Sequence, residues 1–224
     1  MTTGPQERLT AVGPIVRTGD TSMQTPQQLF VHELQQIYAA ELALAAALDR
    51  MSREWTTQEV RRAFQTHRAE TQTHVNRLQE VFDTIGRQPA TVRCAGIDGI
   101  VAEHDSFVEQ YRPTAEMHAL FDVGAGQRAE HYEIAAYEEL VRMANVLGLD
   151  RAARLLEGNL ADERRQLERL GDIAGSFAQS RAAQRAREQV QGGRGRGIRG
   201  PGEPAGRDRP PRGGQARSSE EGES

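Results

Sequence analysis

Apolar positions recur with helical spacing through most of the middle of the chain, and they predict a first helix from Pro26 to about Arg53. Thr25 and Gln28 stand at the two positions of a capping box at its start. The inner stripe of this helix consists of Leu34, Ile37, Glu41, Leu44 and Leu48.

The same spacing predicts a second long helix that begins at a capping box formed by Thr56 and Glu59. Gly86 and Pro89 end it, because neither residue continues a helix well. Its inner stripe consists of Val60, Phe64, His67, Thr71, His74, Leu78, Val81 and Ile85.

Three further helical segments follow: a short one over residues 94–111, a long one over 114–147 and a long one from a cap at Asp150 to about residue 178. No stretch alternates apolar and polar residues in the manner of a strand. The pattern therefore predicts an all-α fold, a four-helix bundle with a short extra helix in the crossover between the second and third long helices.

The two ends of the chain lack this pattern. Residues 1–24 are rich in Gly, Pro, Thr and Gln and are expected to form a flexible arm, and residues 181–224 are expected to form a disordered Arg/Gly/Pro-rich tail. The predicted bundle occupies residues 25–180.

Composition narrows the protein class further. The 224 residues carry a formal net charge of −4 and contain no apolar run long enough to span a bilayer. Cys94 is the single cysteine, and the first residues show no secretory signal. A cytoplasmic protein without membrane contact is the expectation.

Each long helix also carries ionisable residues near the middle of its apolar side. Such groups are unfavourable in a core unless they are paired, hydrogen-bonded or bound to a metal. They are Glu41 on the first helix, His67, Glu70 and His74 on the second, Glu130 and Glu133 on the third, and Glu163 on the fourth.

Their positions along the helices permit one shared site. Counted from the links between the helices, Glu41 lies at about the depth of His67, and Glu133 at about the depth of Glu163. Five converging carboxylates with one or two imidazoles predict two divalent metal ions, either iron or manganese, with zinc as a further candidate.

Other polar residues on these helices have simpler interpretations. Tyr132 and Tyr137 are expected to pack in the core, and Asp162 is expected to be solvated. The remaining histidines are expected to lie on the surface or to form local hydrogen bonds, and these are His32, His104, His118 and His131.

Several separated segments resemble one known family. The segments "RAEHYEIAAYEEL", "AFQTHRAETQTHVNRLQEVF", "IYAAELALAAAL" and "CAGIDGIVAE" are similar, in this order, to the YciE/YciF-like bacterial stress proteins of the ferritin-like superfamily. The resemblance implies a ferritin-like bundle, a homodimer and a dinuclear centre. It implies that His74 lies beside the metal ligands and is not one of them. The metal ligands that it implies are Glu41, His67, Glu70, Glu130, Glu133 and Glu163.

Two functions from different classes remain open at this point. In the first, a stress-response protein binds a dinuclear iron or manganese centre and oxidises Fe(II) or handles peroxide. In the second, a non-enzymatic dimeric scaffold contacts anionic partners or nucleic acid through its tail. The tail "GGRGRGIRGPG" is mildly basic but has no aromatic residue for base stacking, which disfavours nucleic acid.

Overall fold

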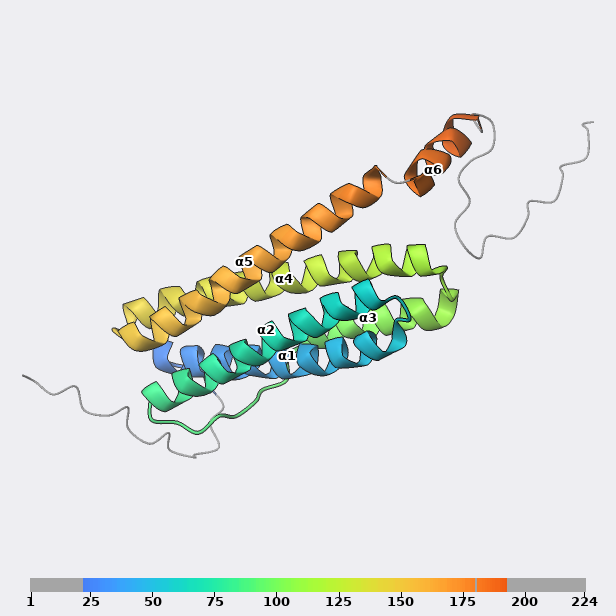
Figure 1. Ribbon diagram of the computed structural model, residues 1–224. Helices are drawn as coiled ribbons and strands as arrows, with labels where there is room; N and C mark the ends of the chain where they lie inside the picture. The colour runs from blue at the N-terminus through green and yellow to red at the C-terminus, as the bar shows by residue number, and fades with distance from the viewer. Residues whose placement is uncertain (1–21, 180, 193–224) are drawn as a thin grey trace, which may run out of the picture. The chain divides into compact units, whose positions relative to one another are not determined.

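The computed structural model describes residues 22–179 and 181–192, and within these ranges the chain forms six α-helices and no β-strand (Figure 1). The predicted all-α fold is confirmed, and the third helix is the short one in the crossover. The helices are α1 (Pro26–Glu54), α2 (Gln58–Thr84), α3 (Ala95–Tyr111), α4 (Ala115–Val146), α5 (Asp150–Ala178) and α6 (Arg181–Gly192).

The four long helices α1, α2, α4 and α5 form the bundle. Short links join α1 to α2 and α4 to α5, so that the helices of each pair are in extensive contact, and only the C-terminal end of α5 diverges from α4 (Figure 1). The pairs meet where α2 contacts α5 and α1 contacts α4, and α3 packs on both α1 and α4. This is a ferritin-like four-helix bundle with a crossover between its halves.

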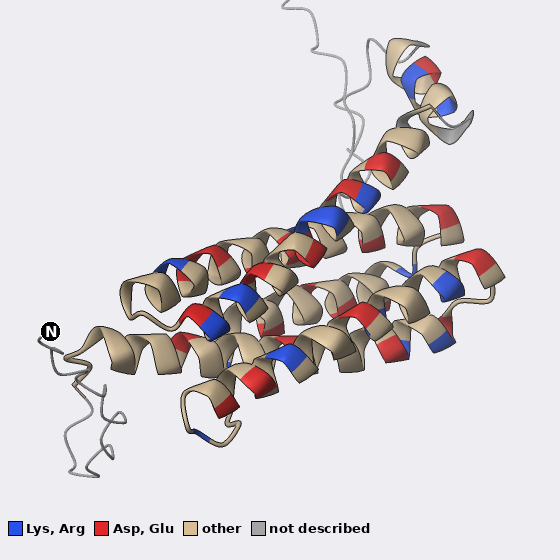
Figure 2. Cartoon of the chain, turned by 60° about the vertical axis from the view of Figure 1, so that its left-hand side comes forward, with Lys and Arg blue, Asp and Glu red and all other residues tan. Residues whose placement is uncertain are grey.

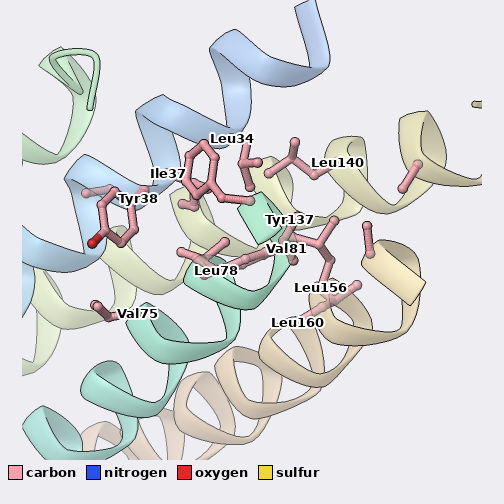
Figure 3. Packing of buried hydrophobic residues seen from close by; sticks show 14 of the residues in the cluster. Leu34, Ile37, Tyr38, Val75, Leu78, Val81, Tyr137, Leu140, Leu156 and Leu160 are labelled. Carbon is pink, nitrogen blue, oxygen red and sulfur yellow. The ribbon is translucent and has the colours of Figure 1, made fainter. Parts of the chain in front are cut away.

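Side chains from all four long helices fill the core. Leu34 on α1, Leu78 on α2, Leu140 on α4 and Leu156 on α5 are completely buried and point toward a common interior (Figure 3). Each comes from the apolar stripe of its own helix, so burial of these stripes holds the helices together.

The start of α1 agrees with the sequence prediction, whereas the start of α2 does not. The Thr25 side chain accepts a hydrogen bond from Gln28 N at 3.2 Å, and Gln28 accepts one from Thr25 N at 3.0 Å. The predicted capping box at Thr56 and Glu59 is wrong, because α2 starts after Thr57, whose side chain makes no capping hydrogen bond. The residue three positions after Thr57 is apolar, so it cannot complete a capping box.

The predicted cap at Asp150 is also displaced by one position. Asp150 is the first residue of α5, and Leu149 occupies the cap position. An acidic residue in the first turn still interacts favourably with the positive end of the helix dipole.

Gly96 allows α3 to approach α4 closely. A Cβ atom at this position would lie 2.4 Å from Cε2 of Tyr132, a separation that no side chain tolerates. The absence of a side chain at Gly96 therefore lets the Tyr132 ring pack against the first turn of α3.

The C-terminal segment corrects one prediction. Residues 181–192, predicted as part of a disordered tail, form α6, which belongs to a structural unit of its own. Their sequence, "RAAQRAREQVQG", consists mainly of Ala, Arg, Gln and Glu, which are strong helix formers. The arm over residues 1–21 and the tail over 193–224 lie outside the described residues.

Charged residues are mixed on the surface of the bundle. Acidic and basic residues are both distributed along its helices (Figure 2). None of the described helices has the length and apolar character required to cross a membrane.

Candidate metal centre

Ionisable side chains from all four long helices meet inside the bundle, and we call them the central cluster. Five of its members are no more than 2% exposed, and His67 is half-buried. The cluster consists of Glu41 on α1, His67 and His74 on α2, Glu130 and Glu133 on α4, and Glu163 on α5.

The central cluster contains two groups of three possible metal ligands. One group is Glu41, His74 and Glu163, and the other is Glu130, Glu133 and Glu163. Within each group the ligand atoms lie within 4.8 Å of one another. Glu163 belongs to both groups and so connects them.

The two histidines take different places from those expected. His74 Nδ1 lies 2.8 Å from Glu163 Oε1 and 3.3 Å from Glu41 Oε1, so His74 is part of a ligand group rather than a residue beside it. His67 Nε2 lies 3.2 Å from Glu130 Oε1. Glu41 therefore faces His74 and not His67, which stands about two helical turns away on α2. His67 and His74 share one face of α2, so they differ in depth along the helix, and counting residues from the links misjudged that depth by two turns.

The structure does not bring Glu70 into the central cluster. Its carboxylate accepts a hydrogen bond from Arg169 Nη2 on α5, in a partly exposed ion pair. Glu70 follows His67 by three positions, but the Arg169 side chain holds it at the edge of the bundle. The central cluster therefore has four glutamates and not five.

A hydrogen-bond network supports the central cluster on one side. Tyr137 donates its hydroxyl to Glu41 Oε1, and Asn159 Nδ2 donates to the Tyr137 hydroxyl at 2.9 Å and to the backbone oxygen of His74 at 3.3 Å. Arg77 Nη1 in turn donates to Asn159 Oδ1 at 3.0 Å. This network fixes Glu41 and α2 relative to each other.

Sequence reasoning missed the members of this network. Tyr137 was expected only to pack, and Asp162 was expected to be solvated, yet Asp162 Oδ2 lies 2.5 Å from Arg77 Nη1 and 3.5 Å from His74 Nε2. The position of Tyr137 one turn after Glu133 on the same stripe was the available signal, because a buried tyrosine hydroxyl needs a partner.

Several buried atoms of the central cluster have no hydrogen-bond partner among the described residues. The close approaches of the histidines to the carboxylates lack the alignment of hydrogen bonds. Buried polar atoms without partners are rare because each costs about 1–3 kcal/mol. The atoms are Glu41 Oε2, both ring nitrogens of His74, both side-chain oxygens of Glu130, and Oε1 of Glu133 and of Glu163.

Burial also shifts the titration of these groups. It raises the pKa of Glu133 well above the usual range, and the charges of Glu163 and Glu41 raise it further. Burial also raises the pKa of Glu130 and the pKa of Glu41. Without cations, the central cluster therefore holds protons on carboxylates that are ionised in water at pH 7.

The pKa of His74 shifts in the opposite direction from that of an isolated buried imidazole. Burial acts to lower its pKa, but the carboxylates of Glu163 and Glu41 outweigh burial and raise the pKa to about 10. Burial likewise acts to raise the pKa of Glu163, yet contact with His74 lowers it. A positive charge between Glu41 and Glu163 is thus favourable, whether it comes from a proton or from a metal ion.

An apolar cavity of about 630 Å³ adjoins the central cluster. His67 lines it beside apolar side chains from several helices of the bundle, among them Leu44, Phe64 and Leu170. Of the residues in the cluster, His67 is the one that this cavity contacts, which matches its partial exposure.

Comparison with known proteins links this geometry to a family. A family model described as a domain of unknown function (DUF892) matches residues 25–183. Protein YciF of Escherichia coli K12 is 29% identical over 166 residues, which cover 74% of this chain and 99% of the relative.

Solved structures agree with this match. YcfI from Rhodopseudomonas palustris is 33% identical over 67% of this chain and 96% of its own, with a TM-score of 0.64. The E. coli stress protein YciF is 29% identical over 71% of this chain and 100% of its own, with a TM-score of 0.66. A protein from Xanthomonas campestris is 23% identical, covers 74% of this chain and 99% of its own with a TM-score of 0.57, and supports the fold alone.

Proposed function

The chain belongs to the DUF892 family of YciF-like proteins, and on that premise we propose that its central cluster binds two divalent iron or manganese ions. We further propose that it acts, like the E. coli stress protein YciF that it resembles, in a response to stress. The function that fits this site best is oxidation of Fe(II) or removal of peroxide.

The buried atoms without hydrogen-bond partners carry this proposal. Four glutamates bring a charge of −4 into an apolar interior when they are ionised, and two divalent ions bring +4. Binding two ions would therefore neutralise the central cluster and give each partnerless oxygen a partner. The combination of carboxylates and imidazoles suits iron and manganese, and also accepts zinc.

The residues have distinct roles in this proposal. Glu41 and His74 would hold one ion, Glu130 and Glu133 would hold the other, and Glu163 belongs to both ligand groups. When bound, iron or manganese would supply the one-electron changes that reaction with peroxide or oxygen requires. His67, whose pKa is lowered mainly by burial, stays neutral and offers Nε2 beside Glu130.

Access and orientation come from residues around the ions. Small oxidants such as peroxide reach the His67 side through the apolar cavity, while the other side is closed by Tyr137 and Asn159. The Tyr137 hydroxyl donates to Glu41 Oε1, the oxygen that also lies 3.3 Å from His74 Nδ1, and this bond orients the carboxylate.

Metal analysis of the whole protein tests the proposal. After removal of bound metals and exposure to Fe(II) or Mn(II), about two equivalents should be retained by the central cluster, and Fe(II) oxidation by hydrogen peroxide should be faster than in buffer. Glu163→Gln should lower the retained metal by about two equivalents and abolish the faster oxidation. Glu157→Gln, which changes an exposed glutamate on the same helix, is the matched control and should change neither.

A protein that folds but retains neither Fe(II) nor Mn(II) would overturn the proposal. It would favour a non-enzymatic scaffold, in which the central cluster is a polar network without cations. If two ions are retained but Fe(II) oxidation is no faster than in buffer, the metal site stands and the proposed reaction fails.

A further inference from the structure

A second polar cluster lies beside the end of the bundle where α1 is linked to α2, and we call it the end cluster. It consists of Trp55 after α1, His104 on α3, and His118 and Asp122 on α4. His104 and Asp122 are buried and His118 is half-buried. The expectation that His104 and His118 lie on the surface or bond only locally is therefore wrong for His104, which bonds to a helix other than its own.

Three ligand atoms converge in the end cluster. His104 Nε2 lies 2.8 Å from Asp122 Oδ1, and His118 Nε2 lies 3.4 Å from the same oxygen. All three atoms lie within 4.8 Å of one another. Ligands bound at about 2.0–2.1 Å around one zinc ion stand roughly 3.0–3.4 Å apart, so the two separations from Asp122 Oδ1 require little adjustment.

The contacts behind these ligands have the arrangement expected around a metal. Asp105 Oδ1 lies 3.1 Å from His104 Nδ1, so it can accept a proton from Nδ1, which leaves the Nε2 lone pair for a cation once the proton shared with Asp122 is lost. Arg50 holds Asp105 through two hydrogen bonds of 2.9 Å. Trp55 Nε1 donates to Asp122 Oδ2 at 3.0 Å, which orients Oδ1 toward the two histidines.

We propose that the end cluster is a binding site for one divalent transition-metal ion of the zinc class, with His104 Nε2, His118 Nε2 and Asp122 Oδ1 as its ligands. When the ion is bound, it takes the place of the protons that the two histidines share with Asp122. Two imidazoles and one carboxylate form a donor set that zinc and iron(II) both accept.

This site is separate from the central cluster. Asp122 precedes Glu130 by eight residues on α4, which places their Cα atoms about 12 Å apart along the helix. No residue belongs to both clusters. His104 and Asp122 line the same apolar cavity as His67, so the remaining coordination positions face space that water or a small ligand can fill.

The competing explanation is a hydrogen-bonded network that needs no metal, and metal stoichiometry separates the two. The full-length protein, freed of metals and dialysed against Zn(II), should retain one equivalent more than its His118→Gln variant. His131→Gln is the matched control because His131 is exposed on the same helix, and it should retain as much zinc as the wild type.

Cobalt(II) supplies an independent readout through its visible absorption. The spectrum should lose one component in His118→Gln and in Asp122→Asn, while a Glu130→Gln/Glu163→Gln variant should keep that component and lose the signal of the central cluster. Equal zinc stoichiometry and equal cobalt spectra in wild type and His118→Gln, both folded by circular dichroism, would overturn the proposal. Asp122→Asn decides the question if His118→Gln does not fold.

Discussion

The central cluster and the end cluster differ in how their buried charges are compensated. In the end cluster, the only carboxylate that is fully buried, Asp122, receives Trp55 Nε1 on one oxygen and His104 on the other. In the central cluster, four glutamates share two imidazoles, and several atoms have no partner among the described residues. The pKa of His104 is raised chiefly by its bond to Asp122, whereas the pKa of Glu133 is raised chiefly by burial.

This difference shows what each cluster needs in order to fold. A paired carboxylate and imidazole satisfy each other, so the end cluster forms whether or not an ion is present. Four carboxylates cannot satisfy one another, so the central cluster needs either protons or cations.

The largest effect is expected from Glu163→Gln. Because Glu163 belongs to both ligand groups of the central cluster, its loss should weaken metal binding there by more than the 10–100-fold typical of groups that only support a ligand. Isothermal titration with Mn(II) measures this change. A Mn(II) affinity within threefold of wild type would show that the central cluster does not need Glu163 to bind metal.

The pH dependence of the metal-free protein should also distinguish the clusters. Burial raises the pKa of Glu130 to about 10 and raises that of Glu133 in the same direction, so above their ordinary pKa the folded state holds protons that the unfolded state has lost. Stability should therefore fall as pH rises from 6 to 8, by up to about 1.4 kcal/mol per pH unit for each such group. His74 acts in the same direction, because its stabilising contribution is lost as pH rises toward about 10.

Urea unfolding at pH 6 and pH 8 measures this slope. Glu133→Gln should flatten it, since the amide resembles the neutral carboxyl group and does not ionise, whereas Glu157→Gln should leave it unchanged. Metal-free protein that is equally stable at both pH values would contradict the assignment of protons to the central cluster.

Tyr137→Phe should destabilise the metal-free protein by about 2 kcal/mol, because Glu41 Oε1 and Asn159 Nδ2 both lose their hydrogen bond to the hydroxyl. Thermal unfolding followed by circular dichroism measures the loss. Tyr38→Phe is a suitable control, since the Tyr38 hydroxyl accepts only a part-buried bond from Gln79. Equal losses in both variants would argue against a special role for the network around Glu41.

Trp55→Phe should destabilise the protein by about 1.5 kcal/mol through the lost hydrogen bond to Asp122. Because the change is confined to the end cluster, Mn(II) binding to the central cluster should remain within a factor of two of wild type. A parallel loss of both properties would show that the clusters are coupled and not separate.

The smallest effect is expected from Glu70→Gln. The ion pair between Glu70 and Arg169 is partly exposed, so its removal should change stability by no more than about 0.5 kcal/mol and leave metal binding unchanged. Loss of one metal equivalent in this variant would return Glu70 to the ligand set that the family resemblance implies.

The fold followed closely from sequence patterns because helical periodicity is a local signal. The stripe around Leu34 and the capping box at Thr25 each lie within one helix, and both were predicted. Helix starts depend on one or two residues and were predicted less accurately. The predicted caps at Thr56 and Asp150 each lie one residue away from the observed cap. The helix in residues 181–192 departs from the prediction because its low apolar content is typical of disorder, whereas its Ala, Arg, Gln and Glu residues favour a helix.

The candidate site was predicted in part for the same reason. Glu41, Glu130, Glu133 and Glu163 interrupt apolar stripes, so their burial follows from periodicity alone, and all four lie inside the bundle. The end cluster was missed because its members come from three segments far apart in the sequence. Nothing near His104 in the chain indicates that Asp122 lies beside it.

The sequence alone determined that four amphipathic helices pack together and that carboxylates lie on their buried sides, because burial depends on the period within a single helix. Only the tertiary structure decided that His74, and not Glu70, joins Glu41 and Glu163, and that His104 meets Asp122. Those choices depend on the rotation of each helix about its axis and on competing partners such as Arg169. Both are properties of packing between segments, and no local pattern encodes them.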